Sequence, residues 1–477
     1  MVNSCLDIVI IGAGLSGINT AHHIQSEFPG WNFAIIETRG DIGGTWNLFR
    51  YPGIRADSDC YTLSFPWYPW TGRPFAEGAS VAQYIRDAAV AHGIDQHILF
   101  HHQLTAASWS DKSQRWTLKT NGTIKQLQAR YVVFGTGYYR YDKALATTIP
   151  GIEQFNGNVL HPQFWPRDFD YAGKRIIVIG SGATAITLLP KLAEKASHVT
   201  MLQRSPSYIL TIPRGDWLNW LPSRLLRIGW IIGLQLFYWF CRSMPRTAQW
   251  ILCFLMRAQL PANVSSTPHF QPQYPPWDQR PCVSPGGDFF TSLKRGRADV
   301  RTATIQAVTD MGILLDTEEF LPADIIVTAT GLHMQAWGGV QLFINGKACD
   351  ISNKFVWNGL MLQDIPNAFC LIGYPTTTWT LGADLNTVLM CRLLKYLARH
   401  GKSAAVPHLA NAKGMKSQSL INLKSTYVKA AEDRMLKTGH THPWRPREYY
   451  LLDYLYAKYG RLETGLQFMT AETHEKS

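Results

Sequence analysis

The sequence has no closely spaced cysteine pair. Its eight cysteines are scattered and never form a C-x-x-C pattern, which excludes a zinc ribbon and a local dithiol redox centre. Only 17% of the 477 residues are charged, whereas 46% are hydrophobic. An apolar fraction of this size can fill real cores, so disorder is excluded as a global description. No repeat of fixed period is present, which excludes a solenoid, a collagen and a coiled coil.

The chain also begins without the features of a secretory signal. Residues 1–4 carry no basic residue, and the apolar run over 8–11 leads into a glycine motif rather than a cleavage site. Together with the scattered cysteines, this favours a cytoplasmic protein. The net charge of +12 favours anionic partners, but Lys and Arg are spread along the chain. Nucleic acid is therefore not expected as a partner, and phosphorylated cofactors are.

A strand–glycine–helix pattern opens the chain. An apolar strand is predicted over 6–11, then a G-x-G-x-x-G motif, a helix to about residue 28 and a second strand over 33–36. The motif glycines are Gly12, Gly14 and Gly17. In dinucleotide-binding folds the first makes a tight turn, the second lets the backbone approach a pyrophosphate, and the third lets the helix pack on the strand. The pattern predicts a dinucleotide site.

An acidic residue selects the dinucleotide. Glu37 ends the second strand, where a carboxylate accepts hydrogen bonds from ribose hydroxyls and disfavours a 2′-phosphate. The site therefore suits FAD or NAD. Further cofactor-binding candidates follow at Gly44, Thr45 and Trp46.

A second such pattern begins at residue 175. A strand over 175–179 leads into a glycine-rich turn, and a strand over 198–202 ends without an acid. The candidate binding residues are Gly180, Gly182, Ala183, Thr184, Arg204 and Ser205. A guanidinium and a hydroxyl at this place suit the 2′-phosphate of NADPH, although Arg204 could also be an ordinary surface charge. Two such units predict a flavoprotein that accepts a hydride from NADPH.

These patterns predict an α/β protein with two Rossmann-like dinucleotide-binding domains and a helical insertion. We expect the first part of the FAD domain over 1–143 and a linker over 144–173. The NADP domain should span 174–331, with an apolar insertion at about 216–260. The rest of the FAD domain and a C-terminal cap should occupy 332–477.

The insertion leaves two alternatives open. Between residues 228 and 241 only Gln235 is strongly polar, and arginines flank the stretch at positions 224, 227, 242 and 246. It is too short for a transmembrane helix. It is either a buried helix pair that covers a pocket or a surface that dips into a membrane.

One motif between the two units resembles a known family. Residues 155–166 match F-x-G-x-x-x-H-x-x-x-W-P, which is the fingerprint of Baeyer–Villiger monooxygenases, the class B flavoprotein monooxygenases. Residues 44–57 are similar to a second signature, G-x-W-x-x-x-x-Y-P-G-x-R-x-D. The stretches 50–65, 161–207 and 276–280 resemble in particular the ethionamide-activating actinobacterial members. Related N- and S-oxidising monooxygenases usually carry Phe or Tyr in place of Trp165.

The resemblance implies a reaction. FAD and NADPH would be the cofactors, and one oxygen atom of O₂ would be inserted beside the carbonyl of a ketone, giving an ester or lactone. The aromatic content and the apolar insertion suggest a bulky hydrophobic substrate, such as a secondary metabolite. N- or S-oxygenation is the alternative. A disulfide reductase would need a redox cysteine pair, which the chain lacks.

The resemblance also implies site residues. Arg280 occupies the position of the family's active-site arginine, where it would stabilise anionic oxygen. Asp57 occupies the matching aspartate position, where it would orient Arg280, contact the cofactor site and balance the charge. The alternative is a structural Asp–Arg ion pair. His161 sits on the domain connector, where it would couple NADP binding to domain movement or serve the structure. No metal site is expected.

Overall fold

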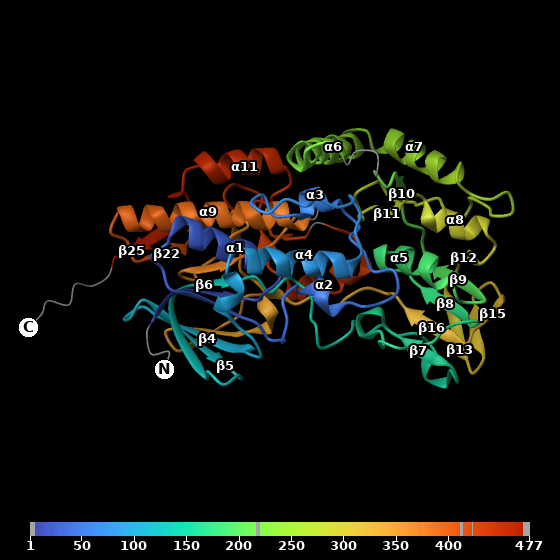
Figure 1. Ribbon diagram of the computed structural model, residues 1–477, viewed down its shortest axis with the longest axis horizontal. Helices are drawn as coiled ribbons and strands as arrows, with labels where there is room; N and C mark the ends of the chain where they lie inside the picture. Colours follow the sequence, from blue (N-terminus) through green and yellow to red (C-terminus); the bar gives the residue numbers. More distant parts are fainter. Residues whose placement is uncertain (1–4, 216–219, 375, 411–413, 422, 471–477) are drawn as a thin grey trace, which may run out of the picture.

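The computed structural model describes residues 5–215, 220–374, 376–410, 414–421 and 423–470 (Figure 1). The chain forms a mixed α/β protein built on two open sheets, which confirms the predicted fold class. Within these ranges no helix is both long and apolar enough to cross a membrane.

The first sheet has eleven strands drawn from two separate stretches of chain. They are β1 (Leu6–Ile11), β2 (Phe33–Ile36), β3 (Ile98–Leu99), β4 (Leu104–Ser110), β5 (Arg115–Thr120), β6 (Gln126–Phe134), β17 (Gln341–Ile344), β18 (Lys347–Cys349), β19 (Val356–Trp357), β20 (Met361–Leu362) and β21 (Ala368–Cys370). The main path runs β18-β17-β4-β5-β6-β1-β2-β3, and β21 pairs with the end of β6. Strand β1 lies parallel to β2 and β6, with Ile8 opposite Phe33 and Tyr131.

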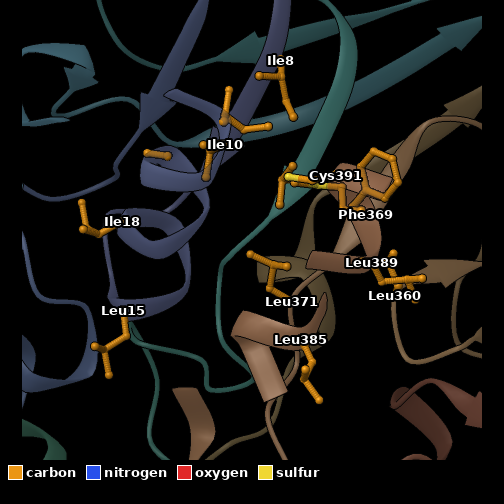
Figure 2. Packing of buried hydrophobic residues seen from close by; sticks show 14 of the residues in the cluster. Ile8, Ile10, Leu15, Ile18, Leu360, Phe369, Leu371, Leu385, Leu389 and Cys391 are labelled. Atoms are coloured by element: carbon orange, nitrogen blue, oxygen red, sulfur yellow. The ribbon is translucent and has the colours of Figure 1, made fainter. Parts of the chain in front are cut away.

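Helices cover this sheet and bury its hydrophobic face. They are α1 (Leu15–Glu27), α2 (Thr45–Leu48), α3 (Cys60–Leu63), α4 (Gly78–Ala91) and α9 (Trp379–Arg399), with 3₁₀ turns at Ile94–His97 and Ala336–Gly339. Figure 2 shows the contact: Ile8 and Ile18, from β1 and α1, lie in one core with Phe369, Leu385 and Leu389 of the distant C-terminal stretch. Long-range apolar packing therefore joins the two stretches into one unit.

The second sheet has five parallel strands. They are β7 (Asn158–Leu160), β8 (Arg175–Ile179), β9 (His198–Gln203), β12 (Ala298–Thr302) and β16 (Ile325–Thr328), flanked by α5 (Ala183–Leu192) and α8 (Asp288–Lys294). The order is β12-β9-β8-β16-β7. The segment 144–173, expected to be a linker, supplies the edge strand β7 and the turns Ile152–Gln154 and Pro162–Phe164. Two small sheets adjoin, from β10 (Ile209–Ile212) with β11 (Cys282–Pro285), and from β13 (Ile305–Thr309), β14 (Gly312–Leu315) and β15 (Phe320–Pro322).

In each of the two large sheets, the strand that leads into the glycine motif is an inner strand. The chain connections to its two neighbours run in opposite directions across the sheet. Strand β1 stands between β2 and β6, and β8 stands between β9 and β16. In open α/β sheets ligands bind at such a switch point, outside the carboxyl ends of the strands. Each glycine motif follows its strand at this place.

The insertion forms α6 (Ser223–Ser243) and α7 (Pro245–Arg257); residues 216–219, its expected start, lie outside the described residues. Arg227 fixes α6 to the core, because its Nη1 donates to the carbonyl oxygens of Tyr61 at 2.7 Å and Ser64 at 2.8 Å, at the end of α3. The inner side of α6 buries Leu226, Tyr238 and Cys241, whereas its outer side faces solvent.

The C-terminal region completes the fold with short strands, two helices and a 3₁₀ turn. It contains β22 (Ala404–Pro407), β23 (Gln418–Ser419), α10 (Thr426–Lys429), a 3₁₀ turn at Glu432–Arg434, β24 (Lys437–Thr438), α11 (Tyr450–Tyr459) and β25 (Leu466–Met469). Helix α11 lies along the same edge as α6 and α7, the upper one in Figure 1.

Candidate active site

A cavity of about 530 Å³ lies between the two glycine motifs. Most of the predicted residues line it, namely Gly12, Gly14, Glu37, Gly44, Thr45, Trp46, Asp57, Gly182, Ala183 and Arg280. The predicted residues outside its lining are Gly17, Gly180, Thr184, Arg204 and Ser205. The structure therefore brings both motifs and the predicted Asp–Arg pair to one site.

Two of the first-motif glycines have no room for a side chain. Gly12 has a φ of +101°, and a Cβ there would lie 2.9 Å from the carbonyl oxygen of Gly135. A Cβ on Gly17 would lie 1.9 Å from the carbonyl oxygen of Gly12. Gly14 and Gly44 lie against each other in the cavity lining, where a Cβ on Gly44 would lie 3.1 Å from the Gly14 Cα. The backbones of Gly14 and Gly44, which carry no side chains, thus form a bare stretch of the lining that we call the Gly14–Gly44 cradle.

Glu37 is buried at the end of β2 and is held by the backbone. Its Oε2 accepts a hydrogen bond from the Ala13 N–H at 2.8 Å, and its Oε1 accepts one from the Arg39 N–H at 2.9 Å. Each carboxylate oxygen keeps a free lone pair for a ribose hydroxyl. Arg39, which the sequence reasoning missed, also lines the cavity and donates to the Gly44 carbonyl at 2.7 Å. A basic residue two positions after Glu37, the predicted ribose-binding acid, was the available signal.

The second motif presents the start of α5 to the cavity. Gly180 has a φ of +129°, and a Cβ there would lie 2.3 Å from the carbonyl oxygen of Ala329. Gly182 is the N-cap of α5, has open space around it, and offers no side-chain cap. The N–H groups of the first turn are therefore free to bind a phosphate. The Thr184 hydroxyl instead bonds the Tyr51 phenol, whose pKa burial raises to about 12.

Arg204 and Ser205 lie beyond this cavity, exposed at the end of β9. Arg204 Nη2 donates to the Thr426 hydroxyl of α10 at 3.1 Å, and the Ser205 carbonyl accepts from the Ser181 hydroxyl at 2.9 Å. Most of the Arg204 donors remain available to a ligand.

Arg280 carries a positive charge into the cavity. Among the described residues it has no hydrogen-bond or ion-pair partner, so its guanidinium donors face open space. Burial would lower the pKa of Arg280, but Asp57 and Tyr138 outweigh that effect and raise this pKa above its ordinary value. The group stays protonated. Asp57 lines the same cavity, yet no direct salt bridge joins the two within the described parts of the chain.

Three tyrosines surround this pair, and sequence reasoning missed all of them. Tyr138 and Tyr139 follow β6, and their hydroxyls lie 3.0 Å apart. Tyr427 comes from α10, and all three line the cavity. Burial raises the pKa of each phenol, so they remain neutral donors beside Arg280. The pair of tyrosines directly after Gly137 was a usable signal, but nothing local marked Tyr427.

Known proteins of similar sequence identify the family to which the chain belongs. The model of the flavin-binding monooxygenase-like family matches residues 6–220. The chain is 41% identical to the FAD-containing monooxygenase EthA of Mycobacterium tuberculosis, covering 97% of each chain. It is 38% identical to the probable FAD-binding monooxygenase AlmA of Acinetobacter baylyi, covering 98% of this chain and 97% of that one. The chain belongs to the flavin-binding monooxygenase-like family. The predicted enzyme class, a flavoprotein monooxygenase, is thereby confirmed.

Solved structures share the fold of this flavin-binding monooxygenase-like protein. A steroid monooxygenase bound to NADP aligns with a TM-score of 0.76 at 20% identity, covering 98% of this chain and all of that one. Cyclohexanone monooxygenase from Rhodococcus sp. Phi1 bound to NADP⁺ aligns with a TM-score of 0.72 at 18% identity, covering 98% and 100%. The two-domain architecture is therefore that of known Baeyer–Villiger monooxygenases.

The fingerprint residues of this monooxygenase lie outside the cavity. His161 begins the turn Pro162–Phe164, where its Nδ1 accepts from the Gln163 N–H at 3.2 Å. Burial lowers the pKa of His161. Trp165 is buried and packs edge-on against Phe169 and Tyr171. These contacts suit a structural or coupling role on the connector rather than general base catalysis.

Proposed function

We propose that the protein is an FAD- and NADPH-dependent Baeyer–Villiger monooxygenase. It would insert one oxygen atom of O₂ between the carbonyl carbon and a neighbouring carbon of a ketone. The other oxygen atom leaves as water, and NADPH supplies the two electrons. The observation that carries the proposal is the Arg280 guanidinium, which has no partner among the residues that the structure describes and lines a cavity between two dinucleotide motifs.

The residues present fit FAD at the first motif. The bare backbones of Gly14 and Gly44 line the cavity and would let a pyrophosphate approach closely, and a Cβ on Gly44 would press against the Gly14 Cα at 3.1 Å. Glu37 would accept hydrogen bonds from the ribose hydroxyls, while Thr45 and Trp46 line the same cavity beside Gly44. When bound and reduced, FAD supplies the activation of O₂.

The second motif fits NADPH. The free N–H groups at the start of α5 would bind its pyrophosphate. Arg204 and Ser205 would take the 2′-phosphate, because an exposed guanidinium at the end of β9 has donors to spare. The end of β9 is followed by no acidic residue, whereas the end of β2 in the first motif is followed by Glu37.

Arg280 supplies the electrostatic part of the chemistry. As the ketone oxygen gains negative charge, the guanidinium would donate hydrogen bonds to it inside a site largely shielded from water. Asp57 keeps the pKa of Arg280 high without occupying its donors. A fixed cation that needs no reorientation lowers the barrier more than one supplied by solvent.

The substrate class we propose is a bulky hydrophobic ketone. Apolar and aromatic side chains such as Leu63, Met334 and Trp379 line much of the cavity. Oxygenation of nitrogen or sulfur is the alternative, and product analysis separates the two. The purified, FAD-loaded protein should convert aryl, alkyl or polycyclic ketones to esters or lactones with NADPH under air. If sulfides give sulfoxides while no ketone in the panel gives an ester, the Baeyer–Villiger assignment is wrong.

A further inference from the structure

One edge of the molecule concentrates its exposed apolar side chains. Of the twenty large apolar side chains that are exposed in the described parts of the chain, fifteen lie on or beside α6, α7 and α11. We call this the apolar helical surface; its members are Trp220, Leu225, Ile228, Ile232, Leu236, Trp239, Met244, Trp250, Phe254, Leu255, Tyr449, Leu451, Leu452, Leu455 and Tyr459. An exposed apolar patch of this kind marks a site of interaction.

The outer face of α6 repeats apolar residues at helical spacing. Ile228, Ile232, Leu236 and Trp239 follow one another at steps of three or four residues and are all exposed. The opposite side of α6 packs into the protein through Tyr238 and Cys241. A helix with an apolar inner side needs no second apolar side for folding, so the outer stripe has another role.

Helix α11 extends the same surface from far along the chain. The Gln235 side chain of α6 accepts a hydrogen bond from the Tyr450 N–H at 3.2 Å, and the rings of Tyr238 and Tyr449 lie 5.9 Å apart. The three helices lie along one edge in Figure 1. Sequence reasoning found the insertion but not α11, because only tertiary packing joins them.

The charges on α6 and α7 have one sign, and the acid of α11, Asp453, accepts a hydrogen bond from the Tyr374 hydroxyl at 2.7 Å. No Asp or Glu occurs over residues 217–277, whereas α6 and α7 carry exposed arginines at 224, 242, 246 and 257. Arg246 and Arg257 form no ion pair with any residue that the structure describes. Lys458 and Arg461 add exposed positive charge at the end of α11.

We propose that the apolar helical surface docks the protein onto an anionic lipid bilayer. Its leucine, isoleucine and tryptophan side chains would enter the boundary between headgroups and acyl chains, and its arginines would bind lipid phosphates. A second copy of the chain is a poorer occupant. Two-fold self-docking would bring the arginines of α6 and α7 against their own copies with no acid on either helix to pair them.

The inner side of α6 contacts the segment that carries Arg280. Tyr238 of α6 packs against Trp277 with ring centroids 5.4 Å apart, and Trp277 stands three residues before Arg280. A small second cavity lies between them, and Leu423 lines both this cavity and the main one. The membrane would thus cover a helix that packs against the segment 276–280, which carries Arg280.

Vesicle sedimentation of the full-length, FAD-loaded protein tests this docking. Vesicles of phosphatidylcholine alone are compared with vesicles that also contain phosphatidylglycerol. We expect wild type to sediment with the anionic vesicles. It should bind less to neutral vesicles, and less to anionic vesicles at high salt.

The double variant Ile232→Glu, Leu236→Glu should bind anionic vesicles at least about tenfold more weakly than wild type. The matched control is Met311→Glu, Phe320→Glu, which changes two apolar side chains of similar exposure in the small β13–β15 sheet, outside the apolar helical surface, and should bind as wild type.

A second pair of variants tests the charges. Arg246→Glu, Arg257→Glu should weaken binding to anionic vesicles about tenfold or more, whereas Arg167→Glu, Arg295→Glu should not. A flavin absorbance spectrum that matches wild type shows that each variant is folded. Wild type that stays in the supernatant with both vesicle types would overturn the proposal. So would an Ile232→Glu, Leu236→Glu variant that binds like wild type, or a wild-type dimer that this variant dissociates without any vesicle binding.

Discussion

Lys424 contacts Asp278 in the segment 276–280, which carries Arg280. Its Nζ lies 2.7 Å from the Asp278 carboxylate, and its backbone N–H donates to the Asp278 carbonyl at 2.7 Å. Asp278 stands two residues before Arg280, next to Trp277, which is buried and has a φ of +72°. A strained backbone of this kind persists only where its surroundings hold it. The C-terminal region therefore positions Arg280.

The first prediction follows from this contact. Lys424→Met removes the nearer of the two charged partners of Asp278, the other being Arg242 at 3.9 Å, and leaves Arg280 in place, so the segment 276–280 loses one of its anchors. Ketone oxidation should fall about tenfold in kcat, because a small displacement of a catalytic group is costly. The KM for NADPH and the FAD content should stay near wild type, and Lys424→Arg should restore most of the rate. A KM effect alone, with kcat unchanged, would contradict a positioning role.

The second prediction concerns the first glycine motif. Gly17→Ala would place a Cβ 1.9 Å from the backbone oxygen of Gly12, which no side-chain movement can relieve. The purified variant should carry at least about tenfold less FAD than wild type, measured by flavin absorbance after denaturation. Gly30→Ala is the control, since a Cβ there meets nothing within 4 Å. Full FAD occupancy in Gly17→Ala would refute the assignment of this turn.

The third prediction concerns coenzyme choice. Arg204→Ala should raise the KM for NADPH about tenfold or more and leave the KM for NADH nearly unchanged, because only NADPH has the 2′-phosphate. Thr426→Ala removes the hydroxyl that Arg204 contacts without removing its charge. That variant should keep the preference for NADPH. Equal losses with both coenzymes would mean that Arg204 does not bind the 2′-phosphate.

The fourth prediction concerns pH. Asp59 is buried at the start of α3, where burial raises its pKa from 3.8 to about 6 despite hydrogen bonds from Thr62. Between these values the folded protein holds a proton that the unfolded chain has lost. This group's contribution to stability therefore falls as pH rises from about 4 to 6.

Asp59→Asn mimics the protonated carboxyl group. It should therefore remove the loss of stability that Asp59 causes as pH rises from about 4 to 6. Relative to wild type, the variant should gain on the order of 2–3 kcal/mol in unfolding free energy between pH 4 and 6. Chemical denaturation at several pH values measures it, with the exposed Asp168→Asn as the control. A constant difference across this range would show that Asp59 does not titrate as described.

Sequence reasoning succeeded where the signal is local. The strands and glycines around Gly12 and Gly180 follow from hydrophobic runs and turn geometry within about 30 residues, and Glu37 stands at a fixed distance from them. It failed where distant segments meet. Tyr427 reaches Arg280 only because the C-terminal region folds back over the cavity, and α11 joins α6 through a contact 215 residues apart in sequence. No periodicity or spacing reports such packing.

The last prediction separates the two oxygenation chemistries. Ester formation develops negative charge on the ketone oxygen in a site shielded from water, where an unpaired charge is costly. Oxygenation of a sulfide develops no such charge and needs no fixed cation. Arg280→Ala should therefore lower ketone oxidation at least about a hundredfold, the usual scale for losing one oxyanion partner. FAD should remain bound, and sulfide oxidation should fall much less. Asp57→Ala should give a smaller defect in the same direction, because it would act through Arg280, whose charge it balances. Product analysis with one ketone and one sulfide, across wild type and both variants, measures these ratios. An Arg280→Ala enzyme that forms ester near the wild-type rate would remove Arg280 from the mechanism, because no other described side chain brings an unpaired cation beside Asp57.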